Sequence, residues 1–278
     1  MRLGLSTPVV VQQPRVASDW EASASPDELV TVARAADELG FDHLTCSEHV
    51  AVPAEAAATR GATYWDPLAT LAFIAAHTTT IRLATSVLVL GYHHPLAIAK
   101  RYGTLDRLSG GRVVLGVGVG SLEDEFTLLG ADWLDRGERA DESLRVLHAA
   151  WGRGSYDGLT VDPHATTTHA PVWVGGRSAR SLRRAVELGD GWMPFGLRPD
   201  ELALLLDGFD LPPGFEVVLS PGRPLDPGAD ADGTRRRLTA LLAAGATIVT
   251  CAVRAESALH HTEQLARLKA LADEIGAD

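Results

Sequence analysis

A glutamate and a histidine, Glu48 and His49, stand side by side where an apolar segment of the sequence ends. That segment, Phe41–Cys46, is typical of a short buried strand, and Gly40 before it marks the end of a helix. In barrels and open sheets built from βα units, ligands bind at the carboxyl ends of the strands. We therefore expect Glu48 and His49 to face a ligand site, where an imidazole can donate or accept a proton.

The roles of these candidate catalytic residues depend on what surrounds them. A carboxylate at Glu48 that lay close to the ring of His49 would favour the protonated imidazole. The alternative is a structural histidine that bonds to a loop carbonyl. In that case His49 takes no part in chemistry.

A second pattern predicts an anion site at the start of a helix. The helix opens with Gly175, Gly176, Arg177 and Ser178, carries Arg180 in its first turn, and has no acid there. Positive charge at this end of a helix is unfavourable by about 0.3–1 kcal/mol per residue unless an anion binds. Glycines let a phosphate approach backbone N–H groups, and Ser178 can donate a further hydrogen bond. The alternative is a tight turn whose arginines lie in solvent.

Another glycine-rich turn, with Gly118, Val119, Gly120 and Ser121, follows a different apolar segment. It lacks the full spacing of a dinucleotide-binding loop and a following acid on the next strand, which disfavours a dinucleotide fold. On a barrel, its glycines would leave room for a flat ring or a phosphate-bearing tail. Two such turns indicate one extended ligand lying across the mouth.

Strand-like and helix-like segments alternate along the chain. Val113–Val117 is a continuous apolar run, typical of a parallel strand buried on both faces. About eight strands, each followed by a helix, in 278 residues predict a (β/α)8 TIM barrel, with a doubly wound open sheet as the alternative. The expected strands are 3–6, 41–46, 81–89, 113–117, 172–174, 192–195, 216–219 and 247–251, and the main helices begin near 26, 66, 95, 138, 178, 199, 234 and 261.

Nothing in the sequence marks a boundary between domains, so residues 1–278 are expected to form one barrel domain. The region from about 121 to 171 is long for a single βα step. Within it, the segment 154–169 is rich in glycine, aspartate and threonine, which is typical of a projecting hairpin or lid.

Acidic residues outnumber basic residues by 36 to 25, giving a formal net charge of −11. This excess argues against nucleic acid or an anionic membrane as the main partner and leaves a small-molecule substrate. The short apolar patch after Arg2 is broken by Pro8, so neither a secretory signal nor a membrane helix is expected. We expect a cytoplasmic protein.

The two cysteines and the paired histidines predict no further chemistry. Cys46 and Cys251 would lie two strands apart in a closed sheet, about 9–10 Å from each other and beyond the disulfide reach of roughly 7 Å. Both are expected to be reduced and buried. His93 and His94 are neighbours on a loop and would rarely face one ion together, so no metal site is expected.

Taken together, these segments resemble the luciferase-like monooxygenase family of flavin- and deazaflavin-dependent α/β barrels. Within that family they are most similar to the F420-dependent oxidoreductases, and the similarity extends over nearly the whole chain. It is carried by the order and spacing of segments 40–42 with 47–49, 85–87, 109–112 leading to 116–120, and 171–176 leading to 188–192.

The resemblance implies a barrel that binds coenzyme F420 and transfers a hydride between the deazaflavin and a small organic substrate. It places a strand-end bulge, often with a non-prolyl cis peptide, against the central ring of the cofactor. It assigns His49 to the active site and Glu48 to a contact with the cofactor. The residues that it assigns to cofactor binding, besides Glu48, are Thr85, Ser86, Val87, Gly118, Val119, Gly120, Ser121, Gly175, Gly176, Arg177 and Ser178.

Two other interpretations fit the same residues. One is an FMN-dependent monooxygenase of this barrel type, which would need a separate reductase. The other is a non-catalytic flavin- or deazaflavin-binding protein. A homodimer is expected in each case. The family's sugar-phosphate dehydrogenases carry a glutamate where this chain has Ser121 and a tryptophan where it has Pro53, so oxidation of a hexose phosphate is not expected.

Overall fold

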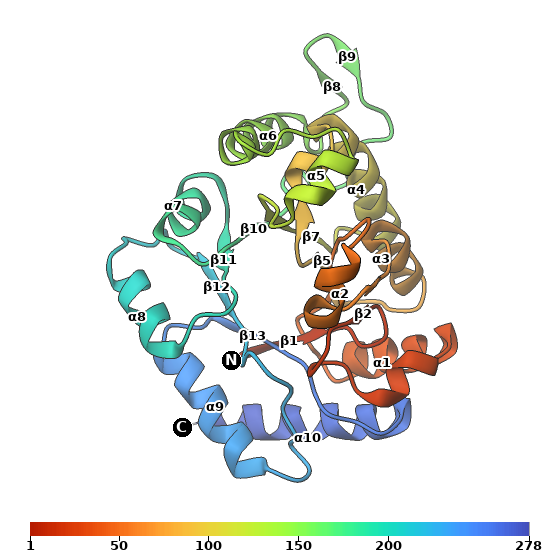
Figure 1. The fold of residues 1–278 in the computed structure, drawn as a ribbon, viewed down its shortest axis with the longest axis vertical. Helices are drawn as coiled ribbons and strands as arrows, with labels where there is room; N and C mark the ends of the chain where they lie inside the picture. The colour runs from red at the N-terminus through yellow and green to blue at the C-terminus, as the bar shows by residue number, and fades with distance from the viewer. Residues whose placement is uncertain (278) are drawn as a thin grey trace.

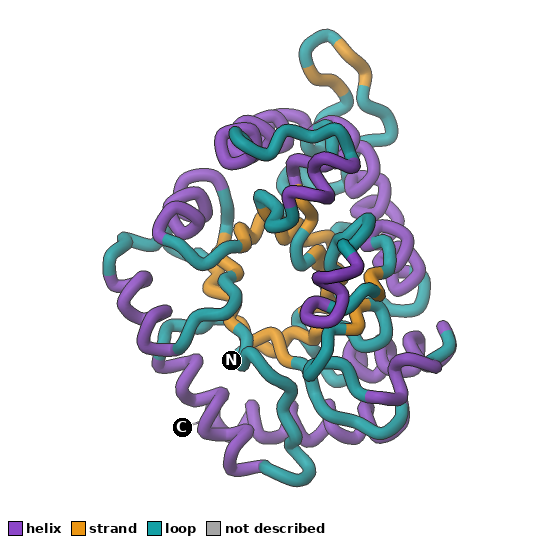
Figure 2. Tube along the Cα trace, in the orientation of Figure 1, coloured by secondary structure: helices purple, strands orange, loops and turns teal. Residues whose placement is uncertain are grey.

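Parallel strands close into a barrel within residues 1–277, the part of the chain that the computed structural model describes. Pairing of β13 with β1, and of β7 with β10, completes the circle, and Figure 2 shows the strands as an inner ring surrounded by helices. The predicted (β/α)8 barrel is confirmed. In order around the barrel, the strands are β1 (Arg2–Ser6), β3 (His43–Cys46), β5 (Arg82–Thr85), β7 (Val113–Gly118), β10 (Val172–Gly175), β11 (Gly191–Met193), β12 (Glu216–Leu219) and β13 (Ile248–Cys251).

Helices form the outer layer, and they begin close to the expected positions (Figure 1). The start of α1 (Pro26–Glu38) illustrates the local cause, because Ser25 and Glu28 cap each other's backbone N–H groups. Pro26 occupies the first helical position, where its missing N–H costs nothing. The other long helices are α3 (Pro67–Ala75), α4 (Pro95–Ser109), α6 (Arg136–Ala150), α7 (Ala179–Leu188), α8 (Pro199–Asp207), α9 (Ala231–Ala243) and α10 (Ala258–Ala277).

The strand expected at 81–89 is divided in two. β5 ends at Thr85, and a short strand β6 (Leu88–Val89) then pairs with the end of β7. Between them the Ser86–Val87 peptide bond is cis, which confirms the bulge that the family resemblance implies.

Several short elements were not predicted from the sequence, and they lie in the loops that follow the strands. The segment after β3, expected to be a loop, contains a helix. The segment after β7 contains another, and a small antiparallel pair joins the loops after β1 and β3. These elements are α2 (Ala54–Arg60), α5 (Glu123–Leu128), β2 (Val11–Gln12), β4 (Thr63–Tyr64) and the 3-10 helices η1 (Asp19–Ser23) and η2 (Leu90–Tyr92).

The expected excursion is a hairpin that projects away from the barrel in Figure 1. Its strands are β8 (Ser155–Tyr156) and β9 (Leu159–Thr160), which pair in antiparallel fashion. Asp157 and Gly158 between them both have positive φ, at 48° and 74°, as a two-residue hairpin turn requires. The Asp-Gly dipeptide is therefore the local cause of the turn.

Ionic groups fill the barrel at the amino ends of the strands. Arg82 donates to Asp42 over 2.6 Å, His43 is fully buried with Asp42 at 2.8 Å, and Trp173 donates to Glu216 over 2.6 Å. Burial alone would raise the pKa of Asp42, but His43 and Arg82 together lower it to about 2. Because these ionic groups fill the amino end of the barrel, the carboxyl ends of the strands are the side where a ligand can bind.

Cys46 and Cys251 are buried free thiols, as expected, and burial raises the pKa of each to about 12. Within residues 1–277, no helix is both long and apolar enough to cross a membrane. The same residues contain no group of three or more His, Cys, Asp or Glu side chains that could hold a metal ion.

Candidate active site at the carboxyl ends of the strands

The bulge at Ser86–Val87 brings together three of the segments predicted to bind a cofactor. A Cβ placed on Gly118 would lie 2.6 Å from Val87 Cγ2, and one placed on Gly175 would lie 2.8 Å from Val87 Cγ1. Only glycine fits at either position, because any side chain would collide with Val87. The ends of β7 and β10 thus pack as bare backbone on the bulge. Whether these segments hold a cofactor remains a prediction.

Ser47 fastens the bulge to the end of β3. Its hydroxyl donates to the carbonyl of Ser86 over 2.6 Å. The next residues along the chain are Glu48 and His49, so this bond places both of them beside the bulge. The half-buried Ser86 and Val87 remain accessible from the mouth.

Both carboxylate oxygens of Glu48 are engaged by protein groups. It is 7% exposed, and its two oxygens accept from the Val89 N–H over 2.7 Å and approach His93 Nε2 at 2.6 Å. Its carboxylate is directed at the loop after β6 and does not reach His49. The expectation that Glu48 would act on the neighbouring imidazole is wrong. A contact between Glu48 and a cofactor remains a prediction.

The acid that meets His49 is Glu125, on α5. Glu125 is 1% exposed, and its Oε2 lies 2.7 Å from His49 Nδ1. The same carboxylate accepts from the Tyr92 hydroxyl over 2.8 Å and from the N–H groups of Val50 and Ala51. Four donors therefore surround one buried carboxylate. His49 is held by this side chain and not by a loop carbonyl.

The electrostatics of this cluster favour an ionised Glu125. Burial by itself raises the pKa of the carboxyl, but hydrogen bonds from His49, Tyr92 and Val50 outweigh burial and lower it below its ordinary value. Burial and the Glu125 carboxylate together raise the pKa of Tyr92, which stays a hydrogen-bond donor. A negative carboxylate on Nδ1 orients the ring and leaves Nε2 as the nitrogen available for proton transfer.

Contacts at the mouth link His49 to side chains of the loops that follow β3 and β7. The ring of Tyr64 meets it edge to face, with centroids 4.5 Å apart. Tyr64 also donates to the carbonyl of Arg60, and the Arg60 guanidinium donates to the hydroxyl of Ser121 over 3.0 Å. Ser121, predicted to contact a cofactor, thus lies next to a cation that the sequence did not single out. Arg60 is the last residue of α2, an element that was not predicted.

The start of α7 is exposed, as an anion site requires, but one of its expected donors is engaged. The Ser178 N–H donates to the Ser181 hydroxyl over 3.1 Å, and the Ser178 hydroxyl accepts from the Ser181 N–H. The two serines cap the helix reciprocally, so the idea that all of these amides face a ligand is wrong for Ser178. Gly176 and Arg177 precede the cap, and the Arg177 guanidinium lies over the Phe195 ring at 6.0 Å.

These residues fit a flat ring with a phosphate-bearing chain. Val87 packs on the bare backbone of Gly118 and Gly175 and is itself only half-buried, so the bulge offers an apolar surface against which a planar ring can pack. Arg177 and the backbone at the start of α7 offer positive charge for a phosphate. Which of the predicted cofactor contacts are made remains a prediction.

The sequence pointed to His49 but missed its partners. Glu125 is 76 residues away and belongs to a short helix that no strong periodicity announces. His93 was considered only as half of a metal pair, whereas it pairs with Glu48, and His94 caps α4.

The structure therefore combines a closed (β/α)8 barrel with an imidazole and a cationic helix start at the carboxyl ends of its strands. The family model for luciferase-like monooxygenases matches residues 1–211 of the chain. The chain belongs to this family, whose members are oxidoreductases and monooxygenases.

Relatives and structural neighbours use two kinds of cofactor. F420-dependent glucose-6-phosphate dehydrogenase of Microbacterium testaceum is 29% identical over 189 residues, which cover 64% of this chain and 55% of that enzyme. An F420-dependent secondary alcohol dehydrogenase, solved with an F420-acetone adduct, superposes with a TM-score of 0.75 at 15% identity, covering 96% and 97% of the two chains.

A third neighbour carries FMN. The oxygenating constituent of 3,6-diketocamphane monooxygenase from Pseudomonas putida, in complex with FMN, has a TM-score of 0.68 at 16% identity, covering 97% and 96% of the two chains. At these identities the structural neighbours show the fold alone.

Proposed function

We propose that this protein is an F420-dependent oxidoreductase that transfers a hydride between the deazaflavin and a small organic substrate, with His49 handling the accompanying proton. The observation that carries the proposal is the His49–Glu125 pair, 2.7 Å apart beside the glycine-lined bulge. When bound, F420 supplies a ring that accepts or donates two electrons as a hydride. The protein's own part is to bind, orient and move the proton.

The residues divide this work between them. The bulge at Ser86–Val87 provides the surface for the ring, Gly118 and Gly175 let Val87 pack closely on β7 and β10, and Ser47 holds the bulge through the Ser86 carbonyl. Glu125 holds His49 through Nδ1, which leaves Nε2 to exchange a proton with a substrate oxygen as the carbon gains or loses hydride. Tyr64 covers one side of the imidazole and limits its rotation.

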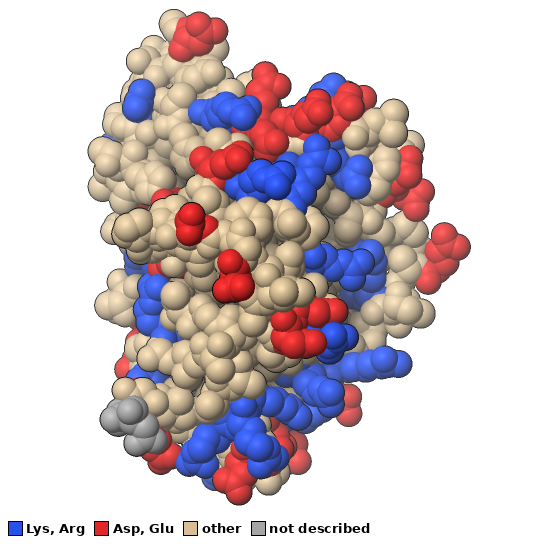
Figure 3. Space-filling model, turned by 90° about the vertical axis from the view of Figure 1, so that its left-hand side faces the viewer, with Lys and Arg blue, Asp and Glu red and all other residues tan. Residues whose placement is uncertain are grey.

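Positive charge near α7 supports the choice of F420. The F420 tail is a phosphodiester with glutamate carboxylates, so it presents more negative groups than the single phosphate of FMN. Arg177 and Arg180 are both exposed at the start of α7. Figure 3 shows basic side chains gathered at the level of α7 and again near α9, on the face turned towards the viewer.

Parallel titrations of the protein with F420 and with FMN, followed by cofactor fluorescence, test the proposal. We expect F420 to bind more tightly. Replacing Arg177 by alanine should weaken F420 binding about two- to fivefold, since an exposed charge at a helix start contributes about 0.3–1 kcal/mol. The control is Arg183→Ala, an exposed arginine further along the same helix. Unaltered F420 fluorescence at high protein concentration would remove the proposal.

A second candidate function is an FMN-dependent monooxygenase. The same residues could hold FMN, and tighter binding of FMN than of F420 would establish this function in place of our proposal. A non-catalytic cofactor-binding protein is distinguished by His49→Ala. Loss of turnover with cofactor affinity retained indicates a catalytic His49, whereas unchanged turnover would eliminate the proton role.

A further inference from the structure

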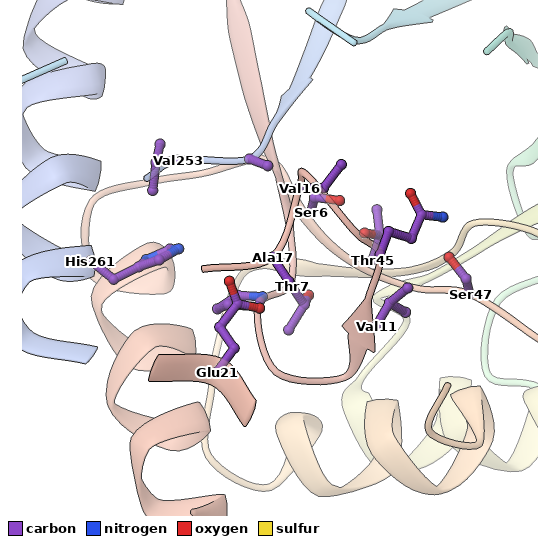
Figure 4. Close-up of a pocket in the computed structure, with 13 residues that line it drawn as sticks. Ser6, Thr7, Val11, Val16, Ala17, Glu21, Thr45, Ser47, Val253 and His261 are labelled. Carbon is purple, nitrogen blue, oxygen red and sulfur yellow. The ribbon is translucent and has the colours of Figure 1, made fainter. Parts of the chain in front are cut away.

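A polar cavity lies beside the bulge, between the carboxyl ends of β13, β1 and β3 (Figure 4). Its volume is about 70 Å³. Since one water needs about 10–15 Å³, this space suits several waters or a molecule of roughly three to six non-hydrogen atoms. The polar side chains that line it include Ser6, Thr7, Glu21, Thr45, Ser47 and His261.

Two buried polar atoms in this lining have no hydrogen-bond partner. His261, on α10, is 2% exposed, and its Nδ1 is unpaired. Thr7, directly after β1, is 5% exposed, and its hydroxyl is also unpaired. Figure 4 shows the His261 ring reaching from α10 towards Thr7 and Glu21. A buried polar atom without a partner costs about 1–3 kcal/mol, so both atoms are suited to bind something that enters the cavity.

Glu21 is already engaged, unlike these two residues. Its oxygens accept from the Val9 N–H over 2.8 Å and from the Ser18 N–H over 2.7 Å, which fixes the loop that forms one wall. The Trp20 ring packs edge to face on His261, with centroids 6.0 Å apart. The wall residues are therefore held in place.

The cavity is connected to the candidate active site through Ser47. Ser47 lines the cavity, and its hydroxyl donates to the Ser86 carbonyl at the bulge. A molecule in the cavity that contacts Ser47 is therefore separated by this one residue from the Ser86–Val87 bulge, the surface proposed for the ring. The cavity thus adjoins the candidate active site.

The charge of the lining selects against anions. Lysine and arginine do not occur among the residues that line the cavity. Burial lowers the pKa of His261 to about 4, so this histidine is neutral at pH 7. Burial likewise raises the pKa of Glu21. An ionised carboxylate there would repel an anion, and a neutral carboxyl group would supply no positive charge. A phosphate or carboxylate would find no counter-charge here.

We propose that this cavity binds the polar end of a small, uncharged hydroxyl or carbonyl compound through His261 Nδ1 and the Thr7 hydroxyl. The inference rests on the proposed function in taking this compound to be the substrate. Binding itself is independent of the cofactor.

The binding test uses propane-1,2-diol as the uncharged probe and lactate as an anion on the same three-carbon skeleton. Protein labelled with 15N-histidine is titrated with each compound in the absence of F420. The diol should shift the ring nitrogens of His261, and lactate should bind at least about tenfold more weakly. An unmoved His261 signal, or equal affinity for lactate, overturns the proposal.

Variants identify the two groups. Thr7→Val, which keeps the shape of the side chain, and His261→Leu should each weaken diol binding about three- to tenfold, as loss of one hydrogen bond does. His261→Asn should recover part of the affinity. The matched control is His260→Leu, since His260 is outside the lining and accepts from the Glu256 N–H. Diol binding by Thr7→Val equal to that of the unaltered protein overturns the proposal even where His261→Leu does not fold.

Failure of this inference and failure of the proposed function are separate results. The F420 titration reports on the ring site without the diol, and the diol titration reports on the cavity without F420. Diol binding without F420 binding would retain the cavity and remove the redox role.

Discussion

Replacing Glu125 by glutamine tests whether one buried carboxylate organises the mouth of the barrel. The variant keeps the size of the side chain and removes its charge. The backbone N–H groups of Val50 and Ala51 cannot change direction, so the glutamine carbonyl must face them. Its NH2 group then faces His49 and Tyr92, where the carboxylate had accepted two hydrogen bonds.

The magnitude follows from those two bonds. A hydrogen bond to a charged group contributes about 1.5–3 kcal/mol and a neutral one about 0.5–1.5 kcal/mol, so each bond loses about 1 kcal/mol. We expect the free energy of unfolding to fall by about 2 kcal/mol. In urea denaturation, where the slope is about 1–3 kcal/mol per molar, the midpoint should drop by about 1 M.

The assay has a second readout and a matched control. His49 must accept at Nδ1 in the variant, so its proton moves to Nε2, and the 15N spectrum of the ring should report that tautomer. Glu123→Gln changes an exposed acid on the same helix and should alter neither measurement. If Glu125→Gln behaved like Glu123→Gln in both assays, the reasoning from this cluster would be refuted.

Two further predictions concern stability away from the mouth. Asp42 has a folded-state pKa of about 2 against an unfolded value of about 3.9, so its ionised carboxylate contributes about 2–3 kcal/mol to the free energy of unfolding. This contribution is present above pH 4 and is lost as the pH falls towards 2, which urea denaturation across this range should show. An equally steep decline in Asp42→Asn would contradict the prediction. The Arg112 guanidinium donates hydrogen bonds to four backbone carbonyls, those of Ala75, Thr78, Ile81 and Ser109. A lysine ammonium group cannot reproduce this set of hydrogen bonds. Arg112→Lys should therefore lower the free energy of unfolding by about 2 kcal/mol, whereas Arg183→Lys on the surface of α7 should leave it unchanged. Equal thermal midpoints for the two variants would show that the hydrogen bonds of Arg112 do not contribute to stability.

The barrel could be predicted from the sequence because its signals are local. Continuous apolar runs such as Val113–Val117 specify strands that are buried on both faces, and β7 covers this run. Caps such as Ser25 with Glu28 determine where helices begin. The side of the barrel on which the candidate site residues lie could also be predicted from the sequence, since it depends only on which end of a strand a residue occupies.

The partners within the site could not be predicted, because they depend on tertiary contacts. Glu48 and His49 are neighbours in the chain, but successive side chains in extended backbone point to opposite sides, and each finds a separate partner. Glu125 reaches His49 only after β3 and β7 are placed in the barrel with β5 between them. The reciprocal cap of Ser178 with Ser181 was not predicted, because Ser178 was interpreted as a hydrogen-bond donor to an anion.

The β8–β9 hairpin has a practical consequence for anyone handling this protein. Its tip, Asp157-Gly158, lies between two short strands outside the barrel, and the neighbouring Leu159 is exposed. Backbone of this kind tolerates added residues, since Asp157 and Gly158 are both exposed. An epitope or a fluorophore-labelled cysteine introduced there would immobilise or track the enzyme while leaving the chain ends and the opening of the barrel untouched.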